Sequence, residues 1–455
     1  MTNWTARKEG WAGNSDDARD EFEIDYARIV HSASFRRMQG KTQILNLGDS
    51  DFYRTRLTHS MEVSQVACGI LQHFKKTYTD HAAQPFFPTQ TLMQSICLVH
   101  DLGHPPFGHG GEVALNFCMR ENGGFEGNGQ TLRILSRLEK FSANSGANLT
   151  RRTLLGILKY PAPFNKVVNL NSKPSATGYP SGKKLLDHKK SKPPKCYLDT
   201  EIEIVDWILG EASESDRRNF SLIENQGEKK HDRTLNKSFD CSIMDMADDI
   251  SNGVHDLEDA ISLHLVNGTT FRELVPEEKC THFIENLKHR YEEEFGEDAY
   301  GTFVDKLFEH DGKYRKRQIS RLVHYFISNT VIETKDSLFE EPLFRFRAVM
   351  ADEVSQFCIA LKDFVRDTVI LSPNVQHMEF RGQQMVMEVF DTFSHDPKRF
   401  LLPKTHHLFE QAEARDAGGG ARVICDHISG MTDAYLLKMY ERLYSPRKGS
   451  VFDHL

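Results

Sequence analysis

The sequence predicts a mainly helical, all-α fold, and two observations carry that prediction. Apolar residues recur at steps of three and four along several long segments, which is the spacing of one buried helix face. The alternation of apolar and polar residues that marks half-buried strands is scarce, and no internal repeat is visible. At 455 residues the chain is long enough for one large or two ordinary domains with an ample core.

The first helix that matters for function is expected to begin close to His59. Thr58 or Ser60 is expected to cap it, so that His59 falls in or near the first turn. The apolar stripe that follows at helical spacing consists of Val63, Val66, Ala67, Ile70, Leu71 and Phe74.

A second helix, over residues 92–99, is expected to end in a His-Asp pair. Its apolar residues lead directly into His100 and Asp101, which we therefore expect at a buried helix end. A stiff Pro-Pro turn follows, and then His109 and Glu112 at spacing i, i+3 near the start of another helix, where Gly110-Gly111 is expected to let the backbone approach a ligand. Imidazole and carboxylate groups suit a borderline divalent cation, and an adjacent His and Glu suit proton transfer.

A third helix is expected over residues 243–261, with a carboxylate beside its buried face. Asp248, Asn252 and the pair His255/Asp256 form a polar strip next to that face. A carboxylate in that position is costly unless it is paired or bound to a metal. The apolar face consists of Ile243, Ala247, Ile250, Val254, Leu257 and Ile261.

Composition excludes several classes of protein. The net charge of −8 argues against a wholly basic nucleic-acid binder, and no apolar run approaches the length of a membrane span, so no membrane association is expected. Residues 1–20 are polar and lack the apolar core of a secretory signal. The eight cysteines form no C-x-x-C pair, which favours reduced, buried thiols and a cytoplasmic location.

One segment, residues 171–195, stands apart because it carries seven Lys, four Pro and two Gly with almost no apolar periodicity. We expect a solvated insertion between helices. The alternative is a basic flap over an anionic substrate, or a surface that touches nucleic acid.

The order His … His-Asp … Asp on helices is the pattern of the HD phosphohydrolase superfamily, and the surrounding residues resemble the deoxyguanosine triphosphate triphosphohydrolases (dGTPases) in particular. The resemblance extends from about residue 20 to about residue 440, in the order of the family's motifs. The segments that carry it are 25–32, 35–43, 55–63, 100–112, 125–130, 158–161, 247–251 and Ser429-Gly430-Met431-Thr432-Asp433.

The resemblance implies a metal site formed by His59, His100, Asp101 and Asp248. Two imidazoles and two carboxylates suit Mn²⁺, Fe²⁺, Ni²⁺, Co²⁺ or Zn²⁺ better than Mg²⁺, which prefers oxygen ligands. We expect Mn²⁺ or Mg²⁺ as the ion in use, and Ni²⁺, Co²⁺, Fe²⁺ and Zn²⁺ stay open as alternatives.

The resemblance also assigns the proton chemistry to His109 and Glu112. His109 is expected to act at the α-phosphate, either by activating water or by protonating the departing 5′-oxygen, and Glu112 to hold its tautomer. The alternative for Glu112 is a helix cap. His104 is expected to support a ligand rather than to be one.

Four residues match family positions that contact the triphosphate: Asn128, Lys159, Tyr160 and Lys195. Each carries a group that can donate to anionic oxygens. For the last of these, Lys192 is an equal choice, and for Lys159-Tyr160 the alternative is an ordinary helix end before Pro161.

Three further residues match positions that read the nucleoside. Gln43 matches the residue that reads the base edge, and Asp256 matches the carboxylate that holds the sugar 3′-hydroxyl. Asn252 stands where the family usually has a Tyr that stacks beneath the deoxyribose. Because Asn is smaller and can hydrogen-bond a hydroxyl, we expect looser sugar discrimination or a different base preference.

The resemblance therefore implies an HD-domain hydrolase that converts dGTP, and possibly other dNTPs, to deoxynucleoside and inorganic triphosphate. Two alternatives stay open: an HD nucleotidase or phosphodiesterase acting on another nucleotide, and a nucleotide- or single-strand-DNA-binding protein with vestigial hydrolysis. Expected partners are other copies of the chain, up to a hexamer, and a dNTP or single-stranded DNA effector. The expected organisation is a polar segment (1–24), an HD core (25–270) and a helical C-terminal region (271–455).

Overall fold

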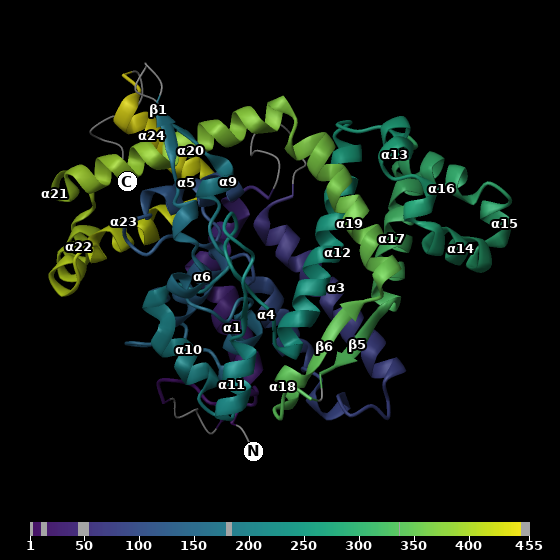
Figure 1. Cartoon of the computed structure of the whole chain (residues 1–455), viewed down its shortest axis with the longest axis horizontal. Coiled ribbons are helices and arrows are strands. Elements are labelled where there is room, and N and C mark those ends of the chain that lie inside the picture. The colour runs from purple at the N-terminus through teal and green to yellow at the C-terminus, as the bar shows by residue number, and fades with distance from the viewer. Residues whose placement is uncertain (1–2, 11–15, 44–53, 179–183, 336, 447–455) are drawn as a thin grey trace. The chain divides into compact units, whose positions relative to one another are not determined.

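The computed structural model describes residues 3–10, 16–43, 54–178, 184–335 and 337–446, and these are mainly helical (Figure 1). The prediction of an all-α fold is confirmed. The described strands form three small antiparallel pairs: β1 (Ala176–Gly178) with β2 (Lys184–Leu186), β3 (Ile223–Glu224) with β4 (Arg233–Thr234), and β5 (Thr330–Thr334) with β6 (Phe346–Met350).

The chain divides into two compact units that are interleaved in sequence. The first unit comprises residues 1–58, 98–237 and 377–455, and the second comprises residues 59–97 and 238–376. The chain passes between them inside α3 (Arg56–Thr77), near the end of α4 (Gln90–Val99), before α12 (Phe239–Ser262) and inside α20 (Pro373–His395). The boundaries at residues 24/25 and 270/271 stay a prediction.

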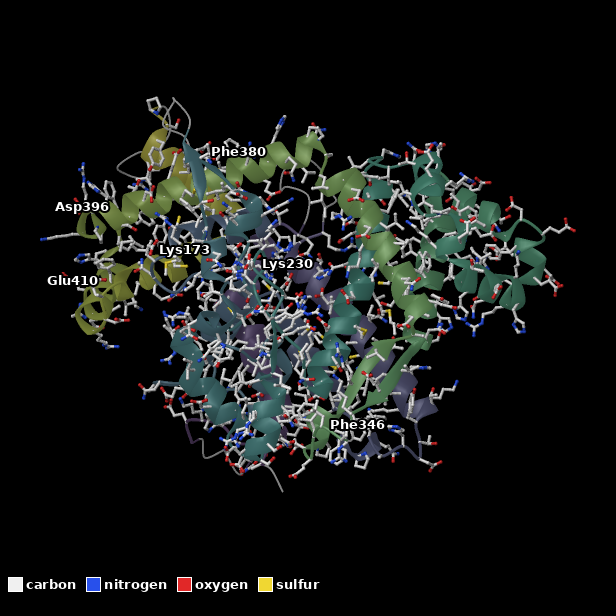
Figure 2. The ribbon with its side chains drawn as sticks, in the orientation of Figure 1. Lys173, Lys230, Phe346, Phe380, Asp396 and Glu410 are labelled. Atoms are coloured by element: carbon white, nitrogen blue, oxygen red, sulfur yellow. The ribbon has the colours of Figure 1, made fainter. Side chains whose placement is uncertain are left out.

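The second unit is built around α12, whose predicted apolar face is fully confirmed: every residue of the predicted stripe is buried. The helix packs on α17 (Gly312–Ser328), α19 (Asp352–Val365) and strand β6. Phe346 of β6, labelled in Figure 2, lies edge-on to Phe239 at the start of α12. The other helices of this unit are α13 (Gly268–Leu274), α14 (Thr281–Arg290), α15 (Glu292–Phe295), α16 (Ala299–Phe308) and α18 (Pro342–Arg345), with η2 (Gln84–Phe86), η6 (Glu277–Lys279) and η7 (Arg366–Ile370).

Helix α3 begins three residues earlier than His59, and its cap differs from the predicted one. Thr58 N donates to Thr55 Oγ1 (3.3 Å) while Thr55 N donates to Thr58 Oγ1 (2.9 Å), a reciprocal pair of capping bonds. The prediction that Thr58 or Ser60 is the cap is therefore wrong, because the Thr55 side chain accepts from Thr58 N in the first turn. The prediction that His59 lies in the first turn is confirmed.

The core of the first unit brings the central chain together with the C-terminal helices. Apolar residues of α5 (Gly108–Cys118) pack with those of α20, α23 (Gly419–Ser429) and α24 (Asp433–Tyr444). The remaining α-helices here are α1 (Glu21–His31), α2 (Ala33–Arg37), α6 (Gly127–Arg133), α7 (Arg151–Ile157), α8 (Phe164–Val167), α9 (His188–Ser191), α10 (Ile202–Leu209), α11 (Glu214–Phe220), α21 (Pro397–Phe400) and α22 (Pro403–Arg415). Shorter helical turns are η1 (Met38–Gly40), η3 (Ile134–Leu138), η4 (Leu170–Ser172) and η5 (Asp199–Glu201).

The Lys-rich segment 171–195 is more ordered than its composition predicts. Its described part contains strands β1 and β2 and helix α9. Asn116 of α5 donates to the backbone oxygen of Ser191 (3.0 Å), and Leu186 is buried in the core of the first unit. The expectation of a wholly solvated insertion is wrong for these residues, since a few small or apolar side chains dock while Lys173, Lys189, Lys190 and Lys192 stay exposed.

Two expectations from composition can be compared with the described residues. None of the eight cysteines forms a disulfide and six of them are buried, as expected for reduced thiols. Within the described ranges, no helix combines the length and the apolar character that a bilayer crossing needs.

Candidate active site

The His-Asp pair of the first unit lies at a buried helix end, as predicted. His100 and Asp101 follow α4 directly, and both are less than a tenth exposed. Asp101 Oδ2 accepts a hydrogen bond from Arg56 Nη1 (2.5 Å), while Asp101 Oδ1 faces His104 Nδ1 at 3.2 Å and His100 Nε2 at 3.6 Å. Burial lowers the pKa of His104 to about 3, so this imidazole is neutral. Arg56 is a site residue that sequence reasoning did not single out.

The second unit contributes a His-carboxylate pair of its own. Helix α3 places His59 and helix α12 places Asp248, and the distance from His59 Nε2 to Asp248 Oδ1 is 3.3 Å. His59 is fully buried. One turn further along α12, Asn252 donates from Nδ2 to the same Asp248 oxygen (2.9 Å). The residue expected to face a sugar therefore also orients a candidate metal ligand.

The first unit thus presents the buried imidazoles of His100 and His104 beside Asp101, and the second presents the buried imidazole of His59 beside Asp248. These are the donor types that borderline divalent cations bind, and clustered His and Asp groups of this kind could hold such an ion. In each unit a hydrogen bond from a neighbouring group, Arg56 or Asn252, fixes the orientation of the carboxylate. Such support is what metal-binding carboxylates require for precise geometry.

His109 and Glu112 lie near the start of α5, with His109 Nδ1 3.3 Å from Glu112 Oε2. The two environments differ: 75% of the His109 side chain is exposed, whereas Glu112 is buried. Burial favours the neutral acid, but Lys195 and the hydrogen bond to His109 hold the pKa of Glu112 well below its usual range. An ionised carboxylate therefore faces Nδ1 of an accessible imidazole, which favours a proton on Nδ1 and leaves Nε2 available.

The backbone around this pair is shaped by close contacts. Phe107 precedes α5 with φ of 61°, in the left-handed region that residues other than Gly rarely adopt. A Cβ on Gly111 would lie 2.0 Å from the Pro106 oxygen, and one on Gly110 would lie 2.7 Å from Glu379 Cγ. These two glycines are therefore needed for close packing of the chain itself, and the expectation that they open the backbone to a ligand is not supported.

The N-terminus of α6 carries a second buried carboxylate, Glu126, which sequence reasoning missed. Its side chain accepts hydrogen bonds from Gly129 N (2.8 Å), Asn128 Nδ2 (2.8 Å) and Lys195 Nζ (2.9 Å). Burial raises the pKa of Glu126 even though Lys195 opposes that change. Two residues expected to hold a triphosphate, Asn128 and Lys195, are thus both hydrogen-bonded to Glu126 in this structure.

Lys195 also lies 3.6 Å from Glu112 Oε1, so it links the two buried carboxylates. The pKa of Lys195 is raised, because Glu112 and Glu126 outweigh the effect of burial. Lys192, the equal choice from the sequence, has an exposed side chain. Of the two lysines, Lys195 is the one that contacts Glu112 and Glu126.

The remaining predicted substrate residues are distributed over both units. In the first unit, Gln43 has a buried side-chain oxygen that accepts no hydrogen bond from any described residue, and Lys159 and Tyr160 are half-buried just after α7. The Lys237 ammonium lies 5.7 Å from the centre of the Tyr160 ring. In the second unit, Asp256 is buried two turns beyond Asp248 on α12.

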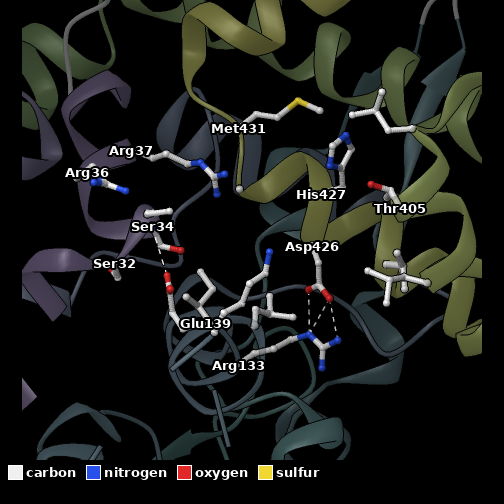
Figure 3. Close-up of a pocket in the computed structure, with 18 of the residues that line it drawn as sticks. Ser32, Ser34, Arg36, Arg37, Arg133, Glu139, Thr405, Asp426, His427 and Met431 are labelled. Carbon is white, nitrogen blue, oxygen red and sulfur yellow. Dashed lines mark hydrogen bonds and ion pairs between the residues drawn. The ribbon is translucent and has the colours of Figure 1, made fainter. Parts of the chain in front are cut away.

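A cavity of about 980 Å³ lies elsewhere in the first unit, between η3 and helices α2, α22 and α23 (Figure 3). Its wall includes Arg133, which forms a bidentate ion pair with Asp426. It also includes Glu139, which accepts a hydrogen bond from Ser34 N (3.3 Å). None of the residues predicted for the site lines this cavity. The candidate site is therefore identified by its metal-binding and proton-transfer groups and not by cavity volume.

Comparison with known proteins gives the family. The HD domain matches residues 56–157, a range that contains His59, His100, Asp101, His109 and Glu112, and the phosphohydrolase-associated domain matches residues 348–442.

Relatives named deoxyguanosinetriphosphate triphosphohydrolase-like protein are similar over nearly the whole chain. The one from Shewanella woodyi is 45% identical over 439 residues, covering 96% of this chain and 95% of its own. The one from Shewanella sp. strain MR-7 is 43% identical over 450 residues, covering 98% and 97%. The protein named deoxyguanosinetriphosphate triphosphohydrolase-like protein 2 from Deinococcus radiodurans is 40% identical over 452 residues, covering 99% and 98%. The chain belongs to the deoxyguanosinetriphosphate triphosphohydrolase-like family of HD-domain phosphohydrolases.

Proposed function

We propose that this protein hydrolyses deoxynucleoside triphosphates, dGTP foremost, to deoxynucleoside and inorganic triphosphate. Water attacks the α-phosphorus, the bond from that phosphorus to the 5′-oxygen breaks, and the 5′-oxygen takes up a proton. The observation that carries the proposal is the exposed His109 imidazole held by the ionised, buried Glu112. A binding protein with vestigial hydrolysis has no need of such a pair.

We propose His59, His100, Asp101 and Asp248 as the ligands of one divalent cation, Mn²⁺ or Mg²⁺, with Ni²⁺, Co²⁺, Fe²⁺ and Zn²⁺ as further candidates. When bound, such an ion supplies Lewis-acid polarisation of a phosphate oxygen and lowers the pKa of water. The donor set supports this because imidazole and carboxylate occur together in both units.

The protein's own groups would do the proton and binding work. Since the Nδ1 proton of His109 is directed to Glu112, Nε2 is the atom that can take a proton from water or give one to the 5′-oxygen. Lys195, Lys159, Tyr160 and Asn128 would donate to the triphosphate. For Asn128 and Lys195 this requires that phosphate oxygens replace Glu126 as acceptor.

Recognition of the nucleoside would fall to Gln43, Asp256 and Asn252. The buried Gln43 oxygen accepts no hydrogen bond within the described ranges, which supports the first role, because a base-edge donor would remove the cost of that unsatisfied group. Asn252 already donates to Asp248 through Nδ2, so its oxygen is the atom that could accept from a sugar hydroxyl.

The test is product analysis with purified protein, Mn²⁺ and each of the four dNTPs in turn, alone and as a mixture. We expect deoxynucleoside and intact triphosphate, with dGTP turned over fastest. Release of pyrophosphate or of single phosphate would favour the alternative of a nucleotidase or phosphodiesterase. No turnover of any dNTP, alone or in the mixture, would contradict the proposal.

Two variants separate the assigned roles. Asp101→Ala should lose both bound Mn²⁺, measured by calorimetry, and turnover. His109→Ala should keep Mn²⁺ and lose turnover by at least about 100-fold, the lower range of general acid–base contributions. His188→Ala, which changes an exposed histidine of the same unit, is the matched control and should keep both.

The sugar hypothesis has its own test. If Asn252 tolerates a 2′-hydroxyl, the wild-type protein should turn over GTP measurably, and Asn252→Tyr should lower the ratio of GTP to dGTP turnover. Equal rejection of GTP by both proteins would contradict it. Mn²⁺ affinity measured alongside shows whether the loss of the Asn252–Asp248 hydrogen bond weakens the metal site instead.

We also propose that the active form is a cytoplasmic homo-oligomer, up to a hexamer, that responds to a dNTP or to single-stranded DNA. Family membership supports this, and light scattering gives the oligomeric state. Turnover with and without added oligodeoxynucleotide or a second dNTP tests the effector.

A further inference from the structure

The loop between α23 and α24, Ser429–Asp433, is one of the segments that carry the resemblance described above, and the proposed chemistry leaves it without a role. Asp433 is the first residue of α24 and only 3% of it is exposed. A carboxylate buried this deeply is costly unless donors surround it. Its hydrogen bonds therefore indicate what the loop is for.

The two oxygens of Asp433 reach two distant segments of the first unit. Oδ2 accepts from Thr42 N (3.0 Å) and from Thr42 Oγ1 (2.5 Å), and Oδ1 accepts from Phe107 N (3.1 Å). Thr42 immediately precedes Gln43, the proposed base reader. Phe107 is the left-handed residue from which α5 starts, two positions before His109.

Lys41 joins the same two segments from the other side. Its buried ammonium donates to His104 O (2.6 Å) and to Ser429 O (2.8 Å). The turn 104–107 is thus held at both ends, at His104 by Lys41 and at Phe107 by Asp433. Only 2% of Lys41 is exposed, and this burial, with the nearby Arg56 charge adding to it, lowers its pKa to about 7.

Two further contacts make the arrangement rigid. Arg56 N donates to Lys41 O (3.2 Å), which ties segment 41–43 to the helix whose first residue also reaches Asp101. A Cβ on Gly382 would lie 2.7 Å from the Phe107 side chain, so α20 holds that side chain in place. The unfavourable φ of Phe107 persists because surrounding groups hold it.

Resting on the function proposed above, we infer that Lys41 and Asp433 are positioning residues that clamp the base-reading segment 41–43 to the turn 104–107, which leads into α5, the helix that carries His109. Neither residue need touch the substrate. Their effect is to fix the distance between the base reader and the proton-transfer imidazole, so that a well-seated base places the α-phosphate at His109.

The main test is Asp433→Asn, which keeps the shape but replaces one acceptor oxygen with an amide donor. We expect kcat/KM for dGTP to fall about tenfold or more, as for loss of a charge-assisted hydrogen bond at a positioning site. The ratio of kcat/KM between dGTP and dATP should fall as well, because the base reader is less well fixed. A merely structural residue would lower the amount of folded protein without changing that ratio.

Thr432→Ala is the matched control. Thr432 lies in the same loop and caps α24 by accepting from Tyr435 N (3.2 Å), but it bonds neither segment. Its loss should cost about 1 kcal/mol of stability and leave the dGTP-to-dATP ratio unchanged. Thr42→Val and Thr42→Ser form a second pair: only Ser keeps the hydroxyl that donates to Asp433, so only Ser should retain the wild-type ratio.

Hydrogen exchange tests the clamp independently of turnover. In Asp433→Asn the amides of residues 41–43 and 107–109 should exchange faster together, whereas in Thr432→Ala they should not. Unchanged exchange in Asp433→Asn, or an equal loss of base selectivity in Thr432→Ala, would overturn the inference. If the wild-type protein turns over no dNTP, the proposed function fails and the exchange result alone decides on the clamp.

Discussion

The starts of helices α5 and α6 each carry one deeply buried glutamate, and the two behave in opposite ways. Glu112 accepts a hydrogen bond from Gly127 N (2.9 Å) and faces His109 and Lys195, and its pKa is held below the ordinary value. Glu126 binds Lys195 more closely, at 2.9 Å, yet burial and the neighbouring Glu112 charge raise its pKa. One lysine cannot fully compensate two carboxylates in a medium of low dielectric constant. In the function proposed above, Glu112 would stay charged beside His109, and Glu126 would be the partner that a phosphate displaces from Asn128 and Lys195.

The largest expected effect is a difference in kcat between substitutions of the two glutamates. Glu112→Gln should lower kcat by about 100-fold or more, because an amide cannot stabilise a charged imidazole. Glu126→Gln should leave kcat within about threefold and lower KM, since weaker hydrogen bonds then hold Asn128 and Lys195 away from the triphosphate. Steady-state kinetics with dGTP measures both. Similar losses of kcat in the two variants would show that the difference between the glutamates is irrelevant to the reaction.

Removing the shared lysine tests stability. Lys195→Met leaves two buried carboxylates without their cation and should cost about 2 kcal/mol, less than for a fully buried pair because a third of the Lys195 side chain is exposed. Thermal unfolding measures the loss. Lys192→Met, at an exposed position, is the control and should change stability by less than about 0.5 kcal/mol. Equal effects of the two substitutions would contradict the assignment of Lys195.

The two glutamates should also give opposite pH dependence. Because the pKa of Glu112 in the folded state lies below its ordinary value of 4.5, its stabilising contribution is present above that pH and is lost as the pH falls further. The pKa of Glu126 is raised, so its contribution is present below pH 4.5 and is lost as the pH rises through the folded-state pKa.

Melting temperatures of wild type, Glu112→Gln and Glu126→Gln over a pH series measure these slopes. The melting temperature of wild type should exceed that of Glu112→Gln by less as the pH falls. Relative to Glu126→Gln, the melting temperature of wild type should fall as the pH rises. Parallel curves for the two variants would refute the opposite shifts.

The smallest expected effect is at Gly127, which follows Glu126 in the chain and donates its N–H to Glu112. An added Cβ would lie 3.2 Å from Glu112 Oε1 and 3.2 Å from the His104 ring, so these groups must shift by a few tenths of an ångström. Gly127→Ala should therefore lower kcat by about threefold and leave the melting temperature nearly unchanged. A large loss of stability would mean that Gly127 matters for packing and not for the position of Glu112.

Much of the local structure could be predicted from the sequence. The apolar steps of α12 predicted its buried face correctly, and the apolar run of α4 predicted that His100 and Asp101 lie at a buried helix end. The errors occurred where several nearby residues could satisfy the same need. Thr55 caps α3 in place of Thr58 or Ser60, and a few docked residues order the Lys-rich segment despite its polar composition.

The helices, the donor types and the close pair His109–Glu112 follow from local sequence, because residues three or four apart on a helix are neighbours whatever surrounds them. The position of Lys195 between Glu112 and Glu126, and the hold of Asp433 on Thr42, 391 positions away, arise only when the chain folds. No spacing rule reaches across such separations. The physical reason is that a buried charge is stable only among partners that folding brings to it, and those partners set its pKa and its role.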